Sequence, residues 1–522
     1  MSDERDRPGR DDKHGGLAAR AARGALWTIL TTSVARAVGL AGTLLLTRFL
    51  DPEEYGEVSL AAVVILTAST VSNCGLSQYL VSKPNAGRAA AFHATFYFTL
   101  LGAVALGLTI ALGESIGAVI HAPGMARFLP GLALAMLLER VATVQDRIQI
   151  RDMRFTSLSV IRSAGELAYS GFAVTLAALG QGAWWGGGNA VVIASIARSG
   201  LRLVALSATT SRREWLEPCR ITWEKTRDLF AFGLPMSVAT LAGFGSRKWD
   251  NLVISHHFGQ ATAGIYNLAY NVADVPASQI GESLGDVLVP SFAKMDDEAR
   301  RRQALLVSMR QLMLLVAPLA VGVGAVAPAI AGLLDPRWAS IDLALAILAI
   351  LSVVRPIGWI AGAYLQVQNR PRTIMVLETA KPIALVALMH LFATWGPRIA
   401  GPDVLGRLGS GEHWACAAVG VVFAANSFSY MWVMARVDGI ALTAQLRAIV
   451  PPIVACAPMM AVVVLLERVL AGAHVAAALR LMIEVAAGAA VFIPSAFVLA
   501  PRASREFVKL LEAAWGRKRA ER

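Results

Sequence analysis

The stretch ASIDLALAILAILSVVRPIGWIAGAYL, residues 339–365, decides the class of fold. It is almost wholly apolar and exceeds the roughly 20 helical residues that cross a bilayer core. Its two charges are Asp342 near one end and Arg355 well inside. A charge at the centre of a lipid-facing helix costs about 2.5–3.5 kcal/mol on insertion scales, so Arg355 is expected to face protein or a wet cavity.

Thirteen further stretches share this character. Of the 522 residues, 56% are hydrophobic and only 16% are charged, whereas an ordinary soluble domain has about 25% charged residues. The segments have helical length, unlike the roughly 10-residue alternating strands of a membrane barrel. The sequence predicts an all-α polytopic membrane protein of about fourteen transmembrane helices. The expected spans are 25–47, 57–80, 90–112, 127–145, 157–179, 184–206, 229–254, 262–288, 304–331, 339–365, 373–395, 414–435, 448–470 and 475–499.

The connections between these spans alternate in charge. One set is rich in Lys and Arg, as at 147–154, 212–227 and 294–302, and the other holds few, as at 113–124 and 396–413. The positive-inside rule then places both termini in the cytoplasm. The net charge of +12 lies largely in these loops and in the tails, and no nucleic-acid motif accompanies it, so we expect no nucleic-acid partner.

These spans predict a domain plan of two six-helix lobes followed by two further helices. The predicted divisions are a disordered N-terminal tail (1–24), an N-lobe (25–206), a linker (207–228), a C-lobe (229–435), helices 13 and 14 (436–499) and a basic amphipathic tail (500–522). A weak internal repeat supports the two lobes. Residues 49–61 align with 258–269 so that Gly56 pairs with Gly264, although chance similarity between apolar sequences is the alternative.

The eighth span carries the clearest polar stripe. Its polar residues recur every three or four positions, which places them on one helical face. They are Asn267, Asn271, Asp274, Ser278, Glu282 and Asp286. A water-filled cavity accommodates such a face more cheaply than lipid does, and the alternative is a structural hydrogen-bonded seam between helices.

Other spans extend this set of polar residues. The seventh adds Arg247, Lys248, Asp250 and Asn251, and the first adds Arg36. Arg36, Arg247 and Arg355 favour an anionic cargo, because a guanidinium grips phosphate oxygens with two donors. Two pairs one helical turn apart are candidates for self-neutralisation within one helix, namely Arg162 with Glu166 and Glu378 with Lys381. The last two spans show few polar residues at mid-depth.

Motifs for chemistry are missing from the sequence. No HExxH, GxSxG or Walker motif occurs. The four cysteines are scattered, and the histidines form no cluster beyond His256 and His257. The sequence therefore predicts no enzyme, no metal site and no cofactor.

At this point a set of ordered motifs resembles the Wzx-type polysaccharide flippases of the MOP exporter superfamily, which is MATE-like in fold. The resemblance covers about residues 20–375, and the segment 395–414 departs from it by its length. The motifs are LTRFLDPEEYG (46–56), RDMRF (151–155), FGLP (232–235), DN (250–251), FG (258–259), YNLAY (266–270), VPSF (289–292) and NRP (369–371).

The resemblance implies a two-lobed bacterial inner-membrane protein with a central cationic cavity. By alternating access it would move an undecaprenyl-diphosphate-linked oligosaccharide to the periplasmic leaflet, coupled to H⁺ or Na⁺ and working with a polysaccharide polymerase and membrane lipids. The stripes supply the candidate residues. For binding substrate they are Arg36, Arg247, Lys248, Asn251, Asn267, Asn271, Ser278 and Arg355. For ion coupling or charge pairing they are Asp250, Asp274, Glu282, Glu378 and Lys381.

Three alternatives remain open on the sequence. A lipid II flippase belongs to the same superfamily. A multidrug cation antiporter of that superfamily fits three midspan arginines poorly. A membrane-bound polymerase or ligase would need large outer loops with catalytic side chains.

Overall fold

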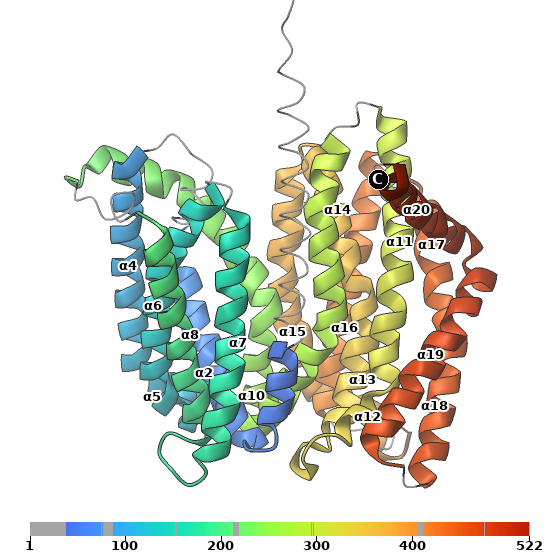
Figure 1. The fold of residues 1–522 in the computed structure, drawn as a ribbon, viewed down its shortest axis with the longest axis horizontal. Coiled ribbons are helices and arrows are strands. Elements are labelled where there is room, and N and C mark those ends of the chain that lie inside the picture. The colour runs from blue at the N-terminus through green and yellow to red at the C-terminus, as the bar shows by residue number, and fades with distance from the viewer. Residues whose placement is uncertain are drawn as a thin grey trace, which may run out of the picture. The chain divides into compact units, whose positions relative to one another are not determined.

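The part of the protein that the structure describes is almost entirely helical (Figure 1). The computed structural model describes residues 38–74, 76, 87–151, 154–211, 219–293, 295, 297–404, 411–473 and 475–520. The α-helices in chain order are α2 (Pro52–Val71), α4 (Gly87–Ala111), α5 (Gly113–Val119), α6 (Leu129–Arg151), α7 (Phe155–Leu179), α8 (Gly187–Thr209), α10 (Trp223–Ala293), α11 (Glu298–Ala325), α12 (Ala327–Ala331), α13 (Ile341–Leu351), α14 (Arg355–Val367), α15 (Pro371–Val404), α16 (Gly411–Val437), α17 (Leu442–Val454), α18 (Cys456–Gly472), α19 (Ala477–Leu499) and α20 (Pro501–Ala520). Short 3₁₀ turns lie at Pro123–Phe128, Pro336–Trp338 and Ser352–Val354.

These helices confirm the predicted all-α, multi-pass membrane class. No strand occurs in the ranges just given, and ten helices there are long and apolar enough to cross a membrane. The count of fourteen is not confirmed. Three other expected spans are also helical: α7 covers 157–179, and α10 covers 229–254 and 262–288 with its two arms, the parts before and after a break at Gly259. None of these three is among the ten.

The chain packs into two compact units. The first consists of residues 1–49, 64–113 and 126–237, and the second of residues 50–63, 114–125 and 238–522. The predicted domain bounds stay a prediction. In the first unit α6 packs on α4 and α8, and α7 packs on α8. In the second, buried side chains of α11, α14 and α16, among them Met309, Tyr364 and Met434, form the largest described core.

Local sequence explains several helix boundaries. Pro52 opens α2, with Glu53 and Glu54 in its first turn, where proline needs no N–H partner and negative charge meets the helix dipole. The side chain of Asp297 caps α11 by accepting a hydrogen bond from the backbone of Ala299 at 2.9 Å. Such a cap satisfies a backbone donor that the helix itself leaves unpaired.

Two predicted outer connections are wrong in detail. The expected spans 229–254 and 262–288 imply a connecting loop between them, yet α10 runs through residues 256–260 with one break at Gly259, whose φ is 82°. Glycine adopts this left-handed conformation without the steric cost of a side chain. The described parts of the segment 396–413, which was predicted to be a long outer connection, are helical as well, because α15 continues to Val404 and α16 begins at Gly411.

A close helix crossing in the second unit involves both glycines of the internal repeat. A Cβ on Gly56 would lie 1.9 Å from the backbone oxygen of Gln260, and a Cβ on Gly264 would lie 2.1 Å from that of Pro52. Only glycine permits this approach. The start of α2 therefore packs directly against the arm of α10 that follows Gly259.

Candidate functional site

The buried end of the candidate site is centred on Asp250. The hydroxyl of Tyr266 donates a hydrogen bond to Asp250 Oδ2 at 2.7 Å, and the backbone and side-chain amides of Asn251 donate to Oδ1 at 2.9 Å. A chain of amides continues from there. Asn267 donates to Asn251 Oδ1 at 2.8 Å, and Asn271 donates to Asn267 Oδ1 at 2.7 Å. The two arms of α10 are thus joined by polar groups.

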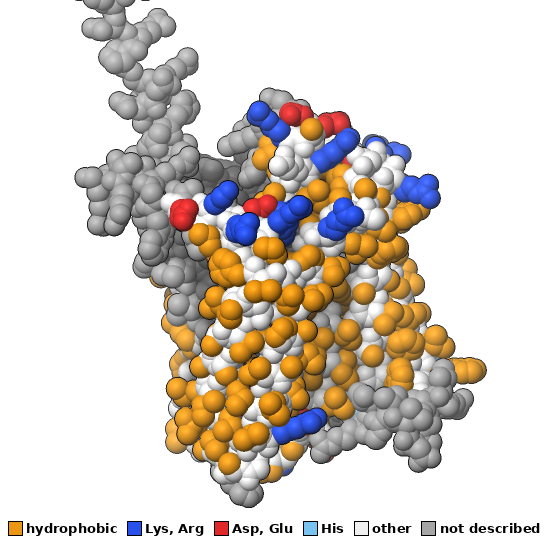
Figure 2. All heavy atoms as spheres, turned by 90° about the vertical axis from the view of Figure 1, so that its right-hand side faces the viewer, with side chains coloured by type: hydrophobic (Ala, Val, Ile, Leu, Met, Phe, Trp, Pro, Cys, Tyr) orange, Lys and Arg blue, Asp and Glu red, His pale blue; other side chains and the backbone are white. Residues whose placement is uncertain are grey.

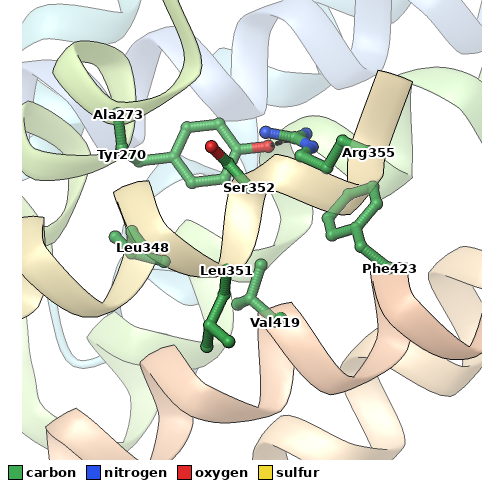
Figure 3. A pocket seen from close by; sticks show the side chains of 9 residues that line it. Tyr270, Ala273, Leu348, Leu351, Ser352, Arg355, Val419 and Phe423 are labelled. Carbon is green, nitrogen blue, oxygen red and sulfur yellow. Dashed lines mark hydrogen bonds between the residues drawn. The ribbon is translucent and has the colours of Figure 1, made fainter. Parts of the chain in front are cut away.

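Arg355, at the start of α14, contacts the next turn of α10. Its guanidinium donates to Asp274 and to the hydroxyl of Tyr270, and lies 4.1 Å from the ring centroid of Phe423. Figure 3 shows Arg355, Tyr270 and Phe423 among the side chains around a cavity of about 10 Å³, about the room of one water molecule. The side chain of Arg355 is 7% exposed and that of Asp274 is 23% exposed. A buried cation is therefore held in place beside a small cavity.

A second charged pair lies on α15 near the same aromatic ring. Lys381 donates to Glu378 Oε2 at 2.6 Å, and Tyr430 donates to Glu378 Oε1 at 2.9 Å. The Lys381 ammonium lies 5.7 Å from the centroid of Phe423. Since Phe423 also contacts Arg355, α14, α15 and α16 bring two cations to one aromatic side chain. Cations are attracted to the face of an aromatic ring within about 6 Å.

The remaining candidates occupy varied positions. Arg247 is exposed and Lys248 is half-buried, whereas Asp250 on the same arm is buried. Ser278 and Glu282 lie on α10, but their side chains are outside the described residues. Arg36 lies outside the described residues altogether. The structure thus brings together Asn251, Asn267, Asn271, Asp250, Asp274 and Arg355, and places Glu378 and Lys381 beside them.

The predicted self-pairing of Arg162 with Glu166 is wrong. Arg162 Nη2 lies 2.6 Å from Asp146 on α6, and Glu166 pairs with Arg198 on α8 at 3.3 Å. Side chains four apart on a helix can meet, but neighbouring helices offer both residues other partners. Glu378 and Lys381 do pair within one helix.

Sequence reasoning missed a charge cluster in the first unit. Arg202 on α8 bridges Glu139 and Asp146 of α6, and Asp146 also accepts from Arg162 of α7. Glu139 and Asp146 are seven residues apart and so share a helical face, which is a signal that could have found them. The cross-helix partners leave no trace in local sequence.

A buried arginine on α6 was missed as well. Arg140 donates to the carbonyl oxygens of Phe98, Ser69 and Ser72 and to both serine hydroxyls, at 2.8–3.2 Å. Its guanidinium also lies 4.1 Å from the ring centroid of Phe98. These bonds join α2, α4 and α6 in the first unit without a carboxylate.

The histidine cluster is larger than the predicted pair of His256 and His257, so the prediction of no further cluster is wrong. In the second unit His121 stacks on His256 with ring centroids 5.1 Å apart, and His257 lies 2.9 Å from His390 between ring nitrogens. His256 and His257 have ring centroids 5.1 Å apart. The chain fold thus brings four histidines into a row. In the described ranges no group of histidine, cysteine and acidic side chains is placed to hold a metal ion.

The last two spans are also more polar than expected. Arg480 of α19 pairs with Glu467 of α18 at 3.2 Å, and Glu484 is fully buried nearby in sequence. Arg480 and Glu484 are four residues apart and so share a helical face, which is a signal that could have found them.

The comparisons with known proteins agree on the class of protein. A family model described as polysaccharide biosynthesis protein matches residues 45–342. The chain is 29% identical over 480 residues to the succinoglycan biosynthesis transport protein ExoT of Rhizobium meliloti (strain 1021), covering 89% of this chain and 90% of that one. It is 23% identical over 359 residues to the lipopolysaccharide biosynthesis protein WzxC of Escherichia coli (strain K12), covering 68% and 71%.

Solved structures show the same fold. The chain is similar to the lipid II flippase MurJ in an inward closed conformation, with a TM-score of 0.69 at 11% identity, over 91% of this chain and 98% of that one. It is also similar to an inward-facing multidrug resistance MATE family transporter of the MOP superfamily, with a TM-score of 0.57 at 15% identity, over 79% and 98%. Identities this low concern the fold alone.

Proposed function

The chain belongs to the polysaccharide biosynthesis protein family and has the fold of the MOP superfamily, and we propose that it is a flippase for lipid-linked oligosaccharides. The observation that carries this proposal is the polar face of α10, where a hydrogen-bonded chain runs from Asp250 to Asn271, and Asp274, three residues further on, pairs with Arg355 of α14. Polar groups buried in membrane helices usually mark a substrate or ion pathway.

We assign the parts of this face by their chemistry. Arg355 on α14, together with Arg247 and Lys248 on α10, supplies positive charge for a diphosphate or acidic sugar. The amides of Asn251, Asn267 and Asn271 can exchange their mutual hydrogen bonds for hydroxyl groups of a glycan. ExoT and WzxC are named for succinoglycan and lipopolysaccharide biosynthesis, so the proposed cargo is an undecaprenyl-diphosphate-linked repeat unit for a surface or exopolysaccharide. Arg36 and Ser278 are proposed as further contacts, and Asp250, Asp274 and Glu282 as groups that couple transport to H⁺ or Na⁺.

The proposal includes a place in the cell. Both termini lie in the cytoplasm of a bacterium, and the protein spans its inner membrane and works with a polysaccharide polymerase rather than as an enzyme. The alternation of basic loops supports this orientation.

A liposome assay with a fluorescently labelled lipid-linked oligosaccharide tests the proposal. The double variant Arg355→Gln/Asp274→Asn removes both charges of the pair and avoids leaving a single buried charge. We expect it to fold and to lose flipping, while Arg505→Gln on α20 flips normally. Undiminished flipping by the double variant, or by Arg247→Ala, would contradict the cationic role.

A cellular experiment separates the main alternative. Deleting the gene should leave a lipid-linked glycan on the cytoplasmic leaflet. Rescue of cells depleted of their peptidoglycan-precursor flippase would instead favour lipid II as cargo. The likeness to MurJ supports that second candidate through the fold only.

A further inference from the structure

A cavity of about 440 Å³ lies at one end of the second unit, among α11, α17, α19 and α20. Its size falls in the range of 300–1,000 Å³ that holds a drug-sized ligand. The polar side chains of its lining are all arginines, namely Arg310, Arg447 and Arg502. The rest of the lining is aliphatic and includes Leu306, Pro451 and Leu499.

The three arginines differ in their partners. Arg310 pairs with Glu506 of α20, and the neighbouring Gln311 donates to the carbonyl of Ala503 at 3.1 Å, which fixes α20 against α11. Arg447 and Arg502 are exposed, and within the part of the chain that the structure describes neither makes an ion pair or a hydrogen bond. The cavity therefore has two positive charges that the protein does not neutralise.

The cavity lies where the apolar surface gives way to a basic band. Figure 2 shows the face formed by the C-terminal helices, with hydrophobic side chains over most of its height and Lys and Arg gathered toward one end. Val498 and Leu499 close α19 with exposed side chains, and Arg502 follows three residues later at the start of α20. Apolar side chains followed by a basic residue are typical of a membrane interface, where the acyl chains of the lipids give way to their headgroups.

We propose that this cavity binds one anionic phospholipid of the inner leaflet. Its phosphate lies between Arg447 and Arg502, and the glycerol and first acyl carbons lie along Leu306, Pro451 and Leu499. Basic pockets between membrane helices on the cytoplasmic side suit lipid phosphate groups. The inference does not rest on the flippase function.

Two competing occupants fit the lining less well. The carrier lipid of an oligosaccharide also has phosphate groups, but its sugars would meet no amide or hydroxyl side chain in this cavity. Free phosphate would leave the aliphatic part of the lining without an apolar partner. Binding would then lack the stabilisation of about 25 cal/mol per Å² that burial of apolar surface provides.

Native mass spectrometry of the detergent-purified full-length chain tests the site. Phosphatidylglycerol, phosphatidylethanolamine, a prenyl diphosphate and inorganic phosphate are each titrated. We expect the wild type to retain one phosphatidylglycerol tightly. In Arg447→Gln/Arg502→Gln the affinity for phosphatidylglycerol should fall roughly 30-fold, since each basic residue contributes about 1 kcal/mol near an anionic surface. The matched control Arg505→Gln/Lys509→Gln removes the same charge from α20 outside the cavity and should bind as the wild type.

A second variant tests the cavity without changing charge. Ala444→Trp fills the lining beside Arg447 and should also release phosphatidylglycerol, with an unchanged Tm in lipid-free detergent. Equal losses in the control variant would indicate general charge attraction and overturn the proposal. Retention by Ala444→Trp, or preference for prenyl diphosphate or for inorganic phosphate over phosphatidylglycerol, would overturn it as well.

Discussion

The polar interior of the first unit and that of the second are built differently. In the first, Glu139 and Asp146 are met by Arg202 and Arg162, so two carboxylates and two guanidiniums neutralise one another across α6, α7 and α8. In the second, Asp250 has neutral donors, and a row of amides leads toward the Arg355–Asp274 pair. Each of the four charges in the first cluster has an oppositely charged partner, whereas the second cluster reaches a cavity beside Arg355.

This difference separates structural from functional polarity. A charge whose partners are all charged and close has little to gain from a ligand, and losing one partner strands the other. Amides and hydroxyls, by contrast, exchange partners at small cost because each both donates and accepts. The comparison therefore assigns folding to the first cluster and transport to the second, and the same substitutions should have opposite readouts in the two units.

The largest expected effect is loss of folded protein on Asp146→Ala. The carboxylate is 4% exposed and pairs with Arg162 and Arg202. Its removal leaves Arg202 with Glu139 alone and takes the carboxylate partner from Arg162, and it should cost about 3 kcal/mol, the lower end for breaking a buried pair. Detergent-solubilised protein should be nearly absent by size-exclusion chromatography. Asp146→Asn keeps the shape and should be milder. Normal amounts of Asp146→Ala protein with no flipping would reverse the assignment.

Arginine-to-lysine substitutions compare the two units directly. Arg355→Lys keeps the charge but loses the two-donor geometry that reaches both Asp274 and Tyr270. We expect roughly 10-fold slower flipping at unchanged yield, the equivalent of one charged hydrogen bond of about 1.5 kcal/mol. Arg202→Lys reaches only one of two carboxylates and should lower the Tm while flipping per folded molecule stays constant. Identical outcomes for both variants would remove the distinction.

Much of the fold was predictable because it depends on local composition. Spans of apolar residues reveal membrane helices, and the spacing of Asn267, Asn271 and Asp274 revealed a polar face on α10. The break at Gly259 was not predictable, since hydropathy alone does not distinguish a one-residue kink from a short connection between two spans. Proline and glycine punctuate a chain, but packing decides what they do.

The partners of the site residues were not predictable. Tyr266, Tyr270, Phe423 and Tyr430 complete the site, yet aromatic residues in an apolar span read as ordinary core. Arg202 finds Glu139 from 63 positions away, and the four histidines come from three separate segments. A single sequence specifies which groups are costly to bury, whereas the fold specifies which groups meet them.

A smaller effect should follow from removing one hydroxyl in each unit. Tyr266→Phe deprives buried Asp250 of a hydrogen bond of 2.7 Å, and a bond to a charged group contributes about 1.5–3 kcal/mol. Tyr97→Phe in the first unit removes only a neutral contact with Thr226 at 3.1 Å, for which about 0.5–1.5 kcal/mol is usual. In thermal unfolding in detergent, the Tm of Tyr266→Phe should be lower than that of Tyr97→Phe. The reverse ranking would mean that Asp250 does not depend on this donor.

The smallest expected effect is a change in how the stability of the second unit depends on pH. Burial, together with the nearby rings of His390, His256 and His121, lowers the pKa of His257 in the connection between the arms of α10. The folded state therefore holds fewer protons than the unfolded chain. Its stabilising contribution is complete above the ordinary histidine value of about 6.5 and is lost as the pH falls below it.

The variant His257→Gln should accordingly flatten the fall of Tm between pH 7.5 and 5.5, and Phe258→Leu, which keeps all four histidines, should not. An unchanged slope in His257→Gln would show that the histidine row does not sense acid. A flattened slope would mean that the histidine row of the second unit changes its charge in the pH range where the guanidiniums of the first unit keep theirs, because guanidinium stays protonated far above it.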